Sequence, residues 1–181
     1  MCKRITLISG GPGVGKTTVI IKTAEILKAQ GYKIGGIVTN EKREGDVRVG
    51  FEIQDLAAQR RGWLAQVNQL TGPRIGKYRV NLDDLERVGT NAIKNAIKNA
   101  DIIIIDEIGP MELFSKTFKE SVTQAMDSVK PVIATVHGKN TDPFVSNVKA
   151  HQDSEVYEIT TENRDLIHNF IIEKINRILS R

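Results

Sequence analysis

Apolar residues along the chain follow two spacings, which predict strands and helices in turn. Short runs rich in β-branched residues are typical of buried strands, and they occupy 5–8, 34–39, 102–105, 131–136 and 156–159. Apolar residues at helical spacing cover 17–28, 85–97, 114–126 and 166–179. Because strand–helix–strand units wind into a parallel sheet with helices on its faces, we predict a three-layer α/β fold with a mostly parallel sheet.

The segment 40–80 breaks this rhythm. Apolar and polar residues alternate over 47–53, residues 60–62 mark a turn, and the apolar pattern resumes at Trp63. This predicts an antiparallel hairpin or meander inserted between parallel units. The insert is either a lobe that covers a ligand or an extension of the sheet edge, and the pattern alone favours neither.

Composition narrows the class of protein without identifying it. The chain has 181 residues, of which 40% are hydrophobic and 27% charged, which excludes disordered and fibrous proteins. This length suits a single domain, residues 1–181, that carries the insert. With 26 basic and 22 acidic residues the net charge is +4, which suits an anionic ligand but does not require nucleic acid.

Cysteine content and the N-terminal pattern favour a cytoplasmic protein. Cys2 is the only cysteine, so an internal disulfide framework and a cysteine-rich metal site are excluded. The first apolar run is only a few residues long, too short for a secretory signal or a membrane span. We therefore expect a buried first strand and no membrane partner.

A glycine-rich loop between the first strand and the first helix predicts a phosphate site. It satisfies G-x-x-x-x-G-K-[ST], whose glycines let backbone N–H groups converge on phosphate oxygens. Lys16 is placed to reach the β- and γ-phosphates, and the Thr17 hydroxyl is placed to bind Mg²⁺. The predicted nucleotide-binding residues are Gly10, Gly11, Pro12, Gly13, Val14, Gly15, Lys16, Thr17 and Thr18.

Asp106 and Glu107 end the run of four isoleucines, at the edge where open α/β sheets bind ligands. We expect Asp106 to hold Mg²⁺ together with Thr17, and Glu107 to orient or deprotonate the water that attacks the γ-phosphate. The alternative is that Glu107 only caps the next segment. We favour the catalytic role, because hydrolysis needs an acid after the metal-binding aspartate, whereas the fold does not need an acid at this position.

A resemblance to a known family is carried by four further strings: TNEKREGDVRVGFEI from Thr39, DEIGPMELFS from Asp106, VHGK from Val136 and NRD from Asn163. With the loop and the acidic pair, they resemble the small P-loop nucleoside-triphosphatases of the THEP type, also called cancer-related nucleoside triphosphatases. The resemblance covers nearly the whole chain. It implies a RecA-like core with an antiparallel β-ribbon insert, and Mg²⁺-dependent hydrolysis of ATP, GTP and other nucleoside triphosphates, CTP and UTP included, with little base selectivity.

Two arginines of the insert are candidates for a cation that stabilises the transition state. Arg43 and Arg48 flank the predicted turn at 45–46, in a loop that follows the second parallel strand near the phosphate edge. The alternative is an exposed, basic hairpin tip. Thr135 or His137, at the end of the strand expected beside the acidic one, is a candidate to bind the attacking water.

Arg164 precedes the last helix, where its guanidinium plane can stack on any base. The neighbouring Asn163 is explained equally well as a helix cap. Stacking without recognition of the base edge predicts specificity constants for ATP, GTP, CTP and UTP that lie within about a hundredfold of one another. Cys2, His151 and His168 lack neighbours at ligand spacing, and we expect surface or packing roles for them.

Two other functions share the phosphate loop. A nucleotide or small-molecule kinase would use 40–80 as an acceptor site or lid, with Glu107 deprotonating an acceptor hydroxyl. A GTP-dependent switch would use the D-x-x-G pattern of 106–109. The guanine signature N-K-x-D is absent, and the string at 163–165 is one residue short of it with Arg in place of Lys, which argues against the switch.

Overall fold

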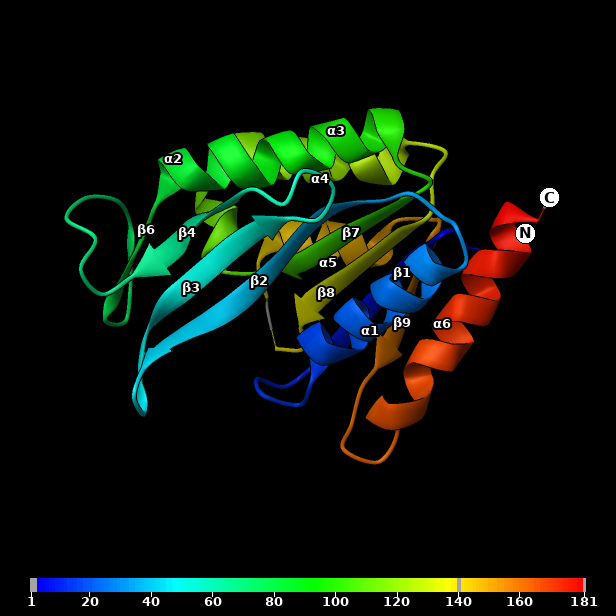
Figure 1. The fold of residues 1–181 in the computed structure, drawn as a ribbon, viewed down its shortest axis with the longest axis horizontal. Coiled ribbons are helices and arrows are strands. Elements are labelled where there is room, and N and C mark those ends of the chain that lie inside the picture. Colours follow the sequence, from blue (N-terminus) through cyan, green and yellow to red (C-terminus); the bar gives the residue numbers. More distant parts are fainter. Residues whose placement is uncertain (1–2, 140, 181) are drawn as a thin grey trace.

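The computed structural model describes residues 3–139 and 141–180, and within them nine strands form one sheet in the order β5-β6-β4-β3-β2-β7-β8-β1-β9 (Figure 1). In chain order the elements are β1 (Ile5–Gly10), α1 (Lys16–Ala29), β2 (Ile34–Glu44), β3 (Val47–Asp55), β4 (Arg61–Gln66), β5 (Arg74–Ile75), β6 (Tyr78–Val80), α2 (Leu82–Asp84), the π-helical segment η1 (Leu85–Thr90), α3 (Asn91–Asn99), β7 (Ile102–Ile108), the 3-10 turn η2 (Glu112–Phe114), α4 (Lys116–Asp127), β8 (Val132–His137), α5 (Pro143–Ala150), β9 (Ser154–Glu158) and α6 (Arg164–Leu179).

The parallel half of the sheet explains the four consecutive isoleucines. β7 lies between β2 and β8 and pairs with both in parallel, so neither of its edges is free. Ile103 and Ile105 pack with residues of α3, α4 and α5, whereas Ile102 and Ile104 pack with residues of α1 and α6. Because side chains alternate along a strand, an uninterrupted apolar run is what a doubly covered strand needs.

The helices therefore form two layers around the sheet, as Figure 1 shows: α1 and α6 on one face, and α3 and α4 on the other. β8 lies between β1 and β7, so the strand before the phosphate loop and the strand with the acidic pair are separated by one strand. This order places the carboxyl ends of β1, β8 and β7 side by side at one edge of the sheet, which is the edge that carries the site.

The insert is a direct continuation of β2. Over Ile34–Ile37 this strand pairs in parallel with β7, and from Ile37 onward it pairs antiparallel with β3. β3, β4, β6 and β5 follow as an antiparallel ribbon, whose inner face contributes Ile53 and Leu64 to the core shared with η1. The ribbon is thus an extension of the sheet edge, and it also borders the cleft described below, so the two interpretations of the insert are compatible.

Several element boundaries differ from the expected ones. The turn is not at 60–62 but just before it, because Arg61 is already the first residue of β4. Ser115 caps α4 by accepting from the amide of Phe118 at 3.1 Å, so Phe114 lies outside that helix and is exposed. The short helix α5 was not expected. Its N-terminus is set by Asp142, whose side chain accepts from the amide of Phe144, with Pro143 as first residue.

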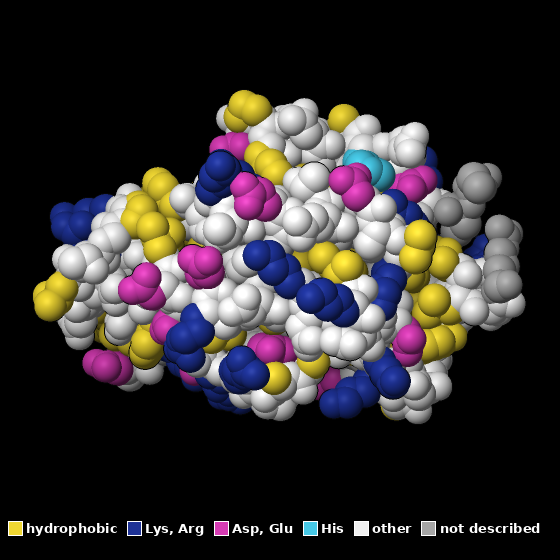
Figure 2. All heavy atoms as spheres, turned by 90° about the horizontal axis from the view of Figure 1, so that it is seen from above, with side chains coloured by type: hydrophobic (Ala, Val, Ile, Leu, Met, Phe, Trp, Pro, Cys, Tyr) yellow, Lys and Arg dark blue, Asp and Glu magenta, His cyan; other side chains and the backbone are white. Residues whose placement is uncertain are grey.

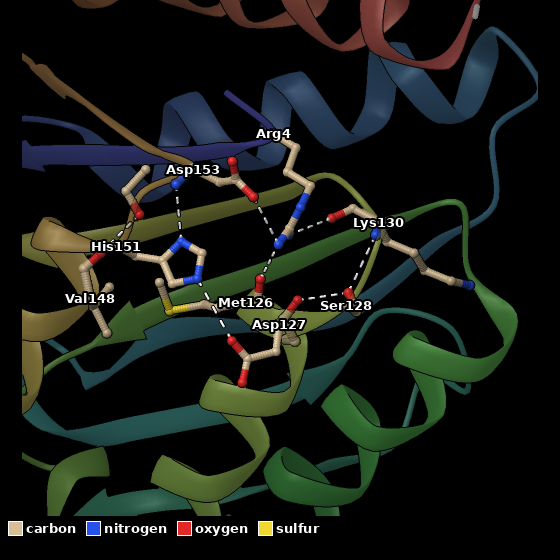
Figure 3. A network of polar contacts seen from close by, with 10 residues as sticks. Arg4, Met126, Asp127, Ser128, Lys130, Val148, His151 and Asp153 are labelled. Atoms are coloured by element: carbon tan, nitrogen blue, oxygen red, sulfur yellow. Dashed lines mark hydrogen bonds and ion pairs between the residues drawn. The ribbon is translucent and has the colours of Figure 1, made fainter. Parts of the chain in front are cut away.

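The opposite, amino edge of the parallel strands is closed by a polar network (Figure 3). Arg4 forms an ion pair with Asp153 at 3.1 Å and donates a hydrogen bond to the carbonyl of Met126 near the end of α4. His151 Nδ1 accepts from the amide of Asp153 at 3.1 Å, and its Nε2 lies 3.7 Å from a carboxylate oxygen of Asp127. These contacts tie the start of β1 to α4 and to the turn before β9.

On the face seen in Figure 2, basic and acidic side chains are interspersed and hydrophobic side chains form small separate groups. A mixture of this kind is typical of a solvated surface and differs from the clustered basic face of a nucleic-acid-binding protein. Across residues 3–139 and 141–180, no helix combines the length and the apolar character needed to span a membrane.

Candidate active site

The phosphate loop connects the end of β1 to α1 in a conformation that its glycines permit. Gly13 and Gly15 have φ values of 74° and 109°, which L side chains rarely adopt. Gly10 packs closely on Ile159, since a Cβ there would lie 2.9 Å from the Ile159 side chain. The loop therefore holds the first amides of α1 exposed toward the carboxyl edge, where a phosphate can accept from them.

Lys16, the first residue of α1, folds back over this loop. It is 8% exposed, and its Nζ donates hydrogen bonds to the carbonyls of Gly10 at 3.1 Å and Gly11 at 3.0 Å. The ammonium group is thus held at the mouth of the loop by neutral acceptors. Its charge acts on both members of the acidic pair, because it lowers the pKa of Asp106 and of Glu107.

Asp106 lies at the carboxyl end of β7 and is 1% exposed. One carboxylate oxygen accepts from Thr135 Oγ1 of β8 at 2.6 Å, and the other lies 3.5 Å from the amide and hydroxyl of Thr39 in β2. Burial raises the pKa of Asp106, whereas the hydrogen bonds from Thr135, Thr17 and Thr39 and the charge of Lys16 lower it. Neighbouring strands on both sides and α1 therefore fix this carboxyl group in one orientation.

These residues fit a magnesium ion by the chemistry of their donors. Thr17 and Asp106 are hydrogen-bonded neighbours, and both present oxygen atoms, the ligand type that Mg²⁺ prefers. A buried carboxylate also needs a compensating cation. Among the described residues no group of three or more His, Cys, Asp or Glu side chains is arranged to hold a metal.

Glu107 follows Asp106 and is half-buried at the wall of a cleft of about 530 Å³. Burial raises the pKa of Glu107, the charge of Lys16 lowers it, and the charge of Asp106 raises it further. The carboxyl group lies on the same wall as the phosphate loop opening. It does not cap the next segment: the turn η2 has Met111 at its cap position without a side-chain cap, and α4 is capped by Ser115.

Glu112 was not anticipated from the sequence. It begins the turn η2 after β7, lines the same cleft, and is 3% exposed. Burial and the charges of Glu107 and Asp106 raise the pKa of Glu112 to about 8. The signal that could have revealed it is an acid set in the apolar string 111–114, where a surface residue has no reason to be.

The ribbon supplies the opposite wall of the cleft, where the two insert arginines have different places. Arg48 lines the cleft and donates to Glu41 at 2.8 Å and to the Tyr78 hydroxyl at 2.9 Å, and its guanidinium carbon lies 5.3 Å from the ring centre of Phe51. Arg43 is absent from the lining of this cleft. It donates to Glu41 at 2.6 Å and to the Asp46 carbonyl at 2.8 Å at the exposed hairpin tip.

The remaining candidates lie beside the loop. Arg164 donates to the Val14 carbonyl at 3.4 Å and borders, with Thr18 and Lys22, a groove of about 360 Å³. Asn163 makes no side-chain cap to α6. Its amide and carbonyl groups instead bond the loop before the helix.

His137 lines the main cleft at the end of β8, whereas Thr135 orients Asp106. The ring of His168 is buried among the residues of α6, in agreement with a packing role. Cys2 lies outside the described residues.

A phosphate loop before α1 and an acidic pair at the end of β7, separated by one strand, define a P-loop nucleotide-binding fold. A family model described as NTPase matches residues 5–172. The chain is 44% identical to the nucleoside-triphosphatase THEP1 of Thermofilum pendens over 182 residues, which cover all of both chains. It belongs to this NTPase family, and it is a hydrolase of the nucleoside-triphosphatase class.

Two solved structures resemble the fold. THEP1 from the hyperthermophile Aquifex aeolicus has a TM-score of 0.85 at 32% identity, covering 96% of this chain and 99% of that one. A human cancer-related nucleoside triphosphatase has a TM-score of 0.83 at 33% identity, covering 96% and 98%. The predicted fold class and family are confirmed, and these relatives do not favour the kinase alternative.

Proposed function

We propose that the chain hydrolyses the γ-phosphate of ATP, GTP, CTP and UTP in a reaction that depends on Mg²⁺. The observation that carries this proposal is the position of Glu107, which follows the buried Asp106 and faces a cleft that the phosphate loop opens into. A second acid at this position serves a water nucleophile, because it can accept a proton at the site where water attacks. A cytoplasmic location is part of the proposal, supported by the single cysteine.

Phosphate binding falls to the loop and to Lys16. The loop amides at the start of α1 donate to the β- and γ-phosphate oxygens, and the helix N-terminus adds positive potential. Lys16 exchanges its bonds to the Gly10 and Gly11 carbonyls for bonds to phosphate, which requires only a small movement of a long side chain. Thr17 and Asp106 would hold the metal ion, which would neutralise charge on the phosphates.

Glu107 acts on the attacking water. The water oxygen forms a bond to the γ-phosphorus while the bond from that phosphorus to the β,γ-bridging oxygen breaks. The nucleoside diphosphate leaves with the electron pair of the broken bond. The proton released by the water goes to the Glu107 carboxylate. Burial raises the Glu107 pKa, and the charge of Lys16 lowers it, so Lys16 favours the ionised form that this task needs.

Arg48 is the better placed of the two insert arginines for the transition-state charge. Arg48 lines the cleft, and its two hydrogen-bond partners, Glu41 of β2 and Tyr78 of β6, belong to the strands that form the same wall. Phe51 and Tyr78 flank its guanidinium group, at 5.3 Å and 5.9 Å from the ring centres. A cation held this way is oriented before the reaction, which is what stabilisation of developing charge requires.

Broad base use is supported by the groove beside the loop. It is bordered by Arg164, Lys22 and Asp165, whose side chains are exposed rather than enclosed around a base edge. A site that hydrogen-bonds one base rejects others strongly because buried polar groups lose their partners. We expect specificity constants for ATP, GTP, CTP and UTP that lie within about a hundredfold of one another, measured as initial rates.

The proposal is tested with Glu107→Gln, which keeps the shape of the side chain and removes the base. The kcat for phosphate release, measured without any acceptor, should fall by roughly a hundredfold or more while the affinity for the Mg²⁺-nucleotide stays within a few-fold. Glu86→Gln, an exposed acid in η1, is the control and should behave as wild type. Equal losses of binding and turnover would assign Glu107 a structural role instead.

A further inference from the structure

Glu112 is a buried acid that the mechanism above does not use. It is 3% exposed, yet it lines the cleft that holds Lys16, Thr17 and Glu107. A carboxyl group at the wall of a reaction cleft, closed off from bulk water, either has a partner or has a function. Its position after β7 is fixed by the turn η2, in which the amide of Ser115 donates to the carbonyl of Glu112 at 3.0 Å.

The carboxyl groups of Glu107 and Glu112 converge on Gly109. A Cβ atom on Gly109 would lie 3.0 Å from an oxygen of Glu107 and 3.2 Å from an oxygen of Glu112. Both carboxyl groups therefore lie next to the same small space, which glycine leaves open because it has no Cβ. Two carboxyl groups that share a low-dielectric site cannot both ionise at neutral pH.

Charged neighbours do not compensate Glu112. Within the described part of the chain, the charges that act on its carboxyl group are those of Glu107 and Asp106, both negative. Hydrogen bonds from its own backbone and that of Gly109 offset only part of the effect. The other charged or titratable side chains along the cleft are Lys16 from α1, Glu41 and Arg48 from the ribbon, and His137 from β8.

The helix α4, which packs on η2, directs its charged residues elsewhere. Lys116, Lys119 and Glu120 border a separate surface depression next to α5. Of the two acids next to Gly109, Glu112 is the more deeply buried, and the Lys16 charge that favours ionisation acts on Glu107. The shared proton therefore belongs on Glu112.

We propose that Glu112 is a positioning residue for Glu107: a neutral carboxylic acid that keeps one proton in the pair, so that Glu107 alone carries the negative charge and faces the attacking water. This inference rests on the proposed role of Glu107. It predicts that ionisation of Glu112 places a second negative charge beside Glu107 and the γ-phosphate. The repulsion weakens triphosphate binding and disturbs the base, so kcat/KM falls as the solution becomes alkaline.

The test compares kcat/KM for Mg²⁺-ATP from about pH 6 to about pH 10 in the wild type, Glu112→Gln, Glu112→Ala and the control Glu86→Gln. The wild type and the control should lose roughly tenfold or more above about pH 8, whereas Glu112→Gln, which cannot ionise, should lose this alkaline decline. At neutral pH, Glu112→Ala should lower kcat by about tenfold with little change in KM, and Glu112→Gln should recover most of that loss.

Superimposable pH profiles for the wild type and Glu112→Gln would overturn the inference, as would normal turnover by Glu112→Ala. Failure of the proposed function is seen separately, because Glu107→Gln would then leave turnover unchanged. A ¹³C NMR titration of the wild-type glutamate carboxyl signals needs no variant to be active. The signal that disappears in Glu112→Gln should titrate well above the ordinary range of glutamate, and titration near the ordinary value would contradict the proposal.

Discussion

The two edges of the parallel sheet treat charge in opposite ways. At the amino edge, Arg4 is matched by Asp153 and by a helix-end carbonyl, and the Asp101 carboxylate accepts from the Lys33 amide at 2.8 Å. At the carboxyl edge, Asp106, Glu107 and Glu112 crowd together with raised pKa values, and within the described residues only Lys16 adds a positive charge that acts on any of them.

The difference shows where stability and activity are located in one continuous sheet. Matched groups at the amino edge lock β1, α4 and β9 together and stabilise the fold. Crowded carboxyl groups at the carboxyl edge destabilise the free protein, and under the proposed function they are tolerated because a bound metal ion would offset their charge. Substitutions at one edge should therefore change activity with little effect on stability, and substitutions at the other should do the reverse.

The largest effect is expected for Lys16→Ala at the carboxyl edge. It removes the side-chain cation of the phosphate loop, so turnover should fall by roughly a thousandfold or more and nucleotide binding should weaken. Circular dichroism should show an intact fold. Lys28→Ala, in the exposed last turn of the same helix, is the control. A Lys16→Ala protein that still turns over normally would contradict the assignment of the site.

Arg48→Ala should slow hydrolysis by up to about a thousandfold while leaving nucleotide affinity within a few-fold. The reason is that the proposed role of the Arg48 guanidinium is to stabilise charge that develops only in the transition state. Arg43→Ala is the matched comparison, since Arg43 shares Glu41 as a partner but lies at the hairpin tip. Single-turnover rates decide between them. Slowing in Arg43→Ala alone would assign the catalytic role to Arg43. Normal rates in both variants would show that neither arginine of the ribbon takes part in catalysis.

At the amino edge, Arg4→Ala should lower the free energy of unfolding by about 2 kcal/mol, because it leaves the Met126 carbonyl and Asp153 without their donor. Its kcat should stay within about twofold of wild type at a temperature where both are folded. Arg177→Ala removes an exposed pair with Glu173 and should cost at most about 0.5 kcal/mol in urea denaturation. Loss of activity in folded Arg4→Ala would show that the two edges are coupled.

The remaining expected effect is a pH dependence of stability. The Glu112 pKa is about 8 in the folded protein and near 4.5 when unfolded, so the folded state binds the proton more tightly between these values. Its contribution to stability is complete below pH 4.5 and is lost as the pH rises to about 8. Relative to the Tm of wild type, the Tm of Glu112→Gln should therefore rise by roughly ten degrees or more between about pH 4 and pH 8 in calorimetry. A constant difference would contradict this.

The parallel half of the fold was predictable because each strand carries its own signal. The isoleucines of β7 and the glycine loop after β1 are local patterns whose meaning does not depend on distant partners. For the ribbon, the sequence predicted an antiparallel hairpin or meander but not the register of its strands. Its pairing shifts between Lys42 and Arg43, and again between Phe51 and Glu52, and such irregularities arise from packing across strands. The turn predicted at 60–62 lies earlier, directly after β3, because the Asp55 side chain accepts from the amides of Ala57 and Ala58.

The same distinction applies to the site. Lys16, Thr17 and Asp106 belong to contiguous motifs, so their spacing predicts their proximity. Predicting the contact of Thr135 with Asp106 requires the order of the strands in the sheet. The sequence indicated a strand beside the acidic one but not which residue of that strand would contact Asp106. Glu112 was missed because its depth is set by a turn without periodicity.

The strand order also determines when the chain can assemble. β2 and β3 are joined by a two-residue turn, so the ribbon forms from contacts that are close in sequence. β1, in contrast, lies between two late strands, with Ile5 opposite both Val132 and Ser154. Such long-range contacts form slowly, and during synthesis they must wait for the second half of the chain to emerge. A nascent chain that stops before β8 can therefore build its hairpins, but the loop that follows β1 has no sheet to support it.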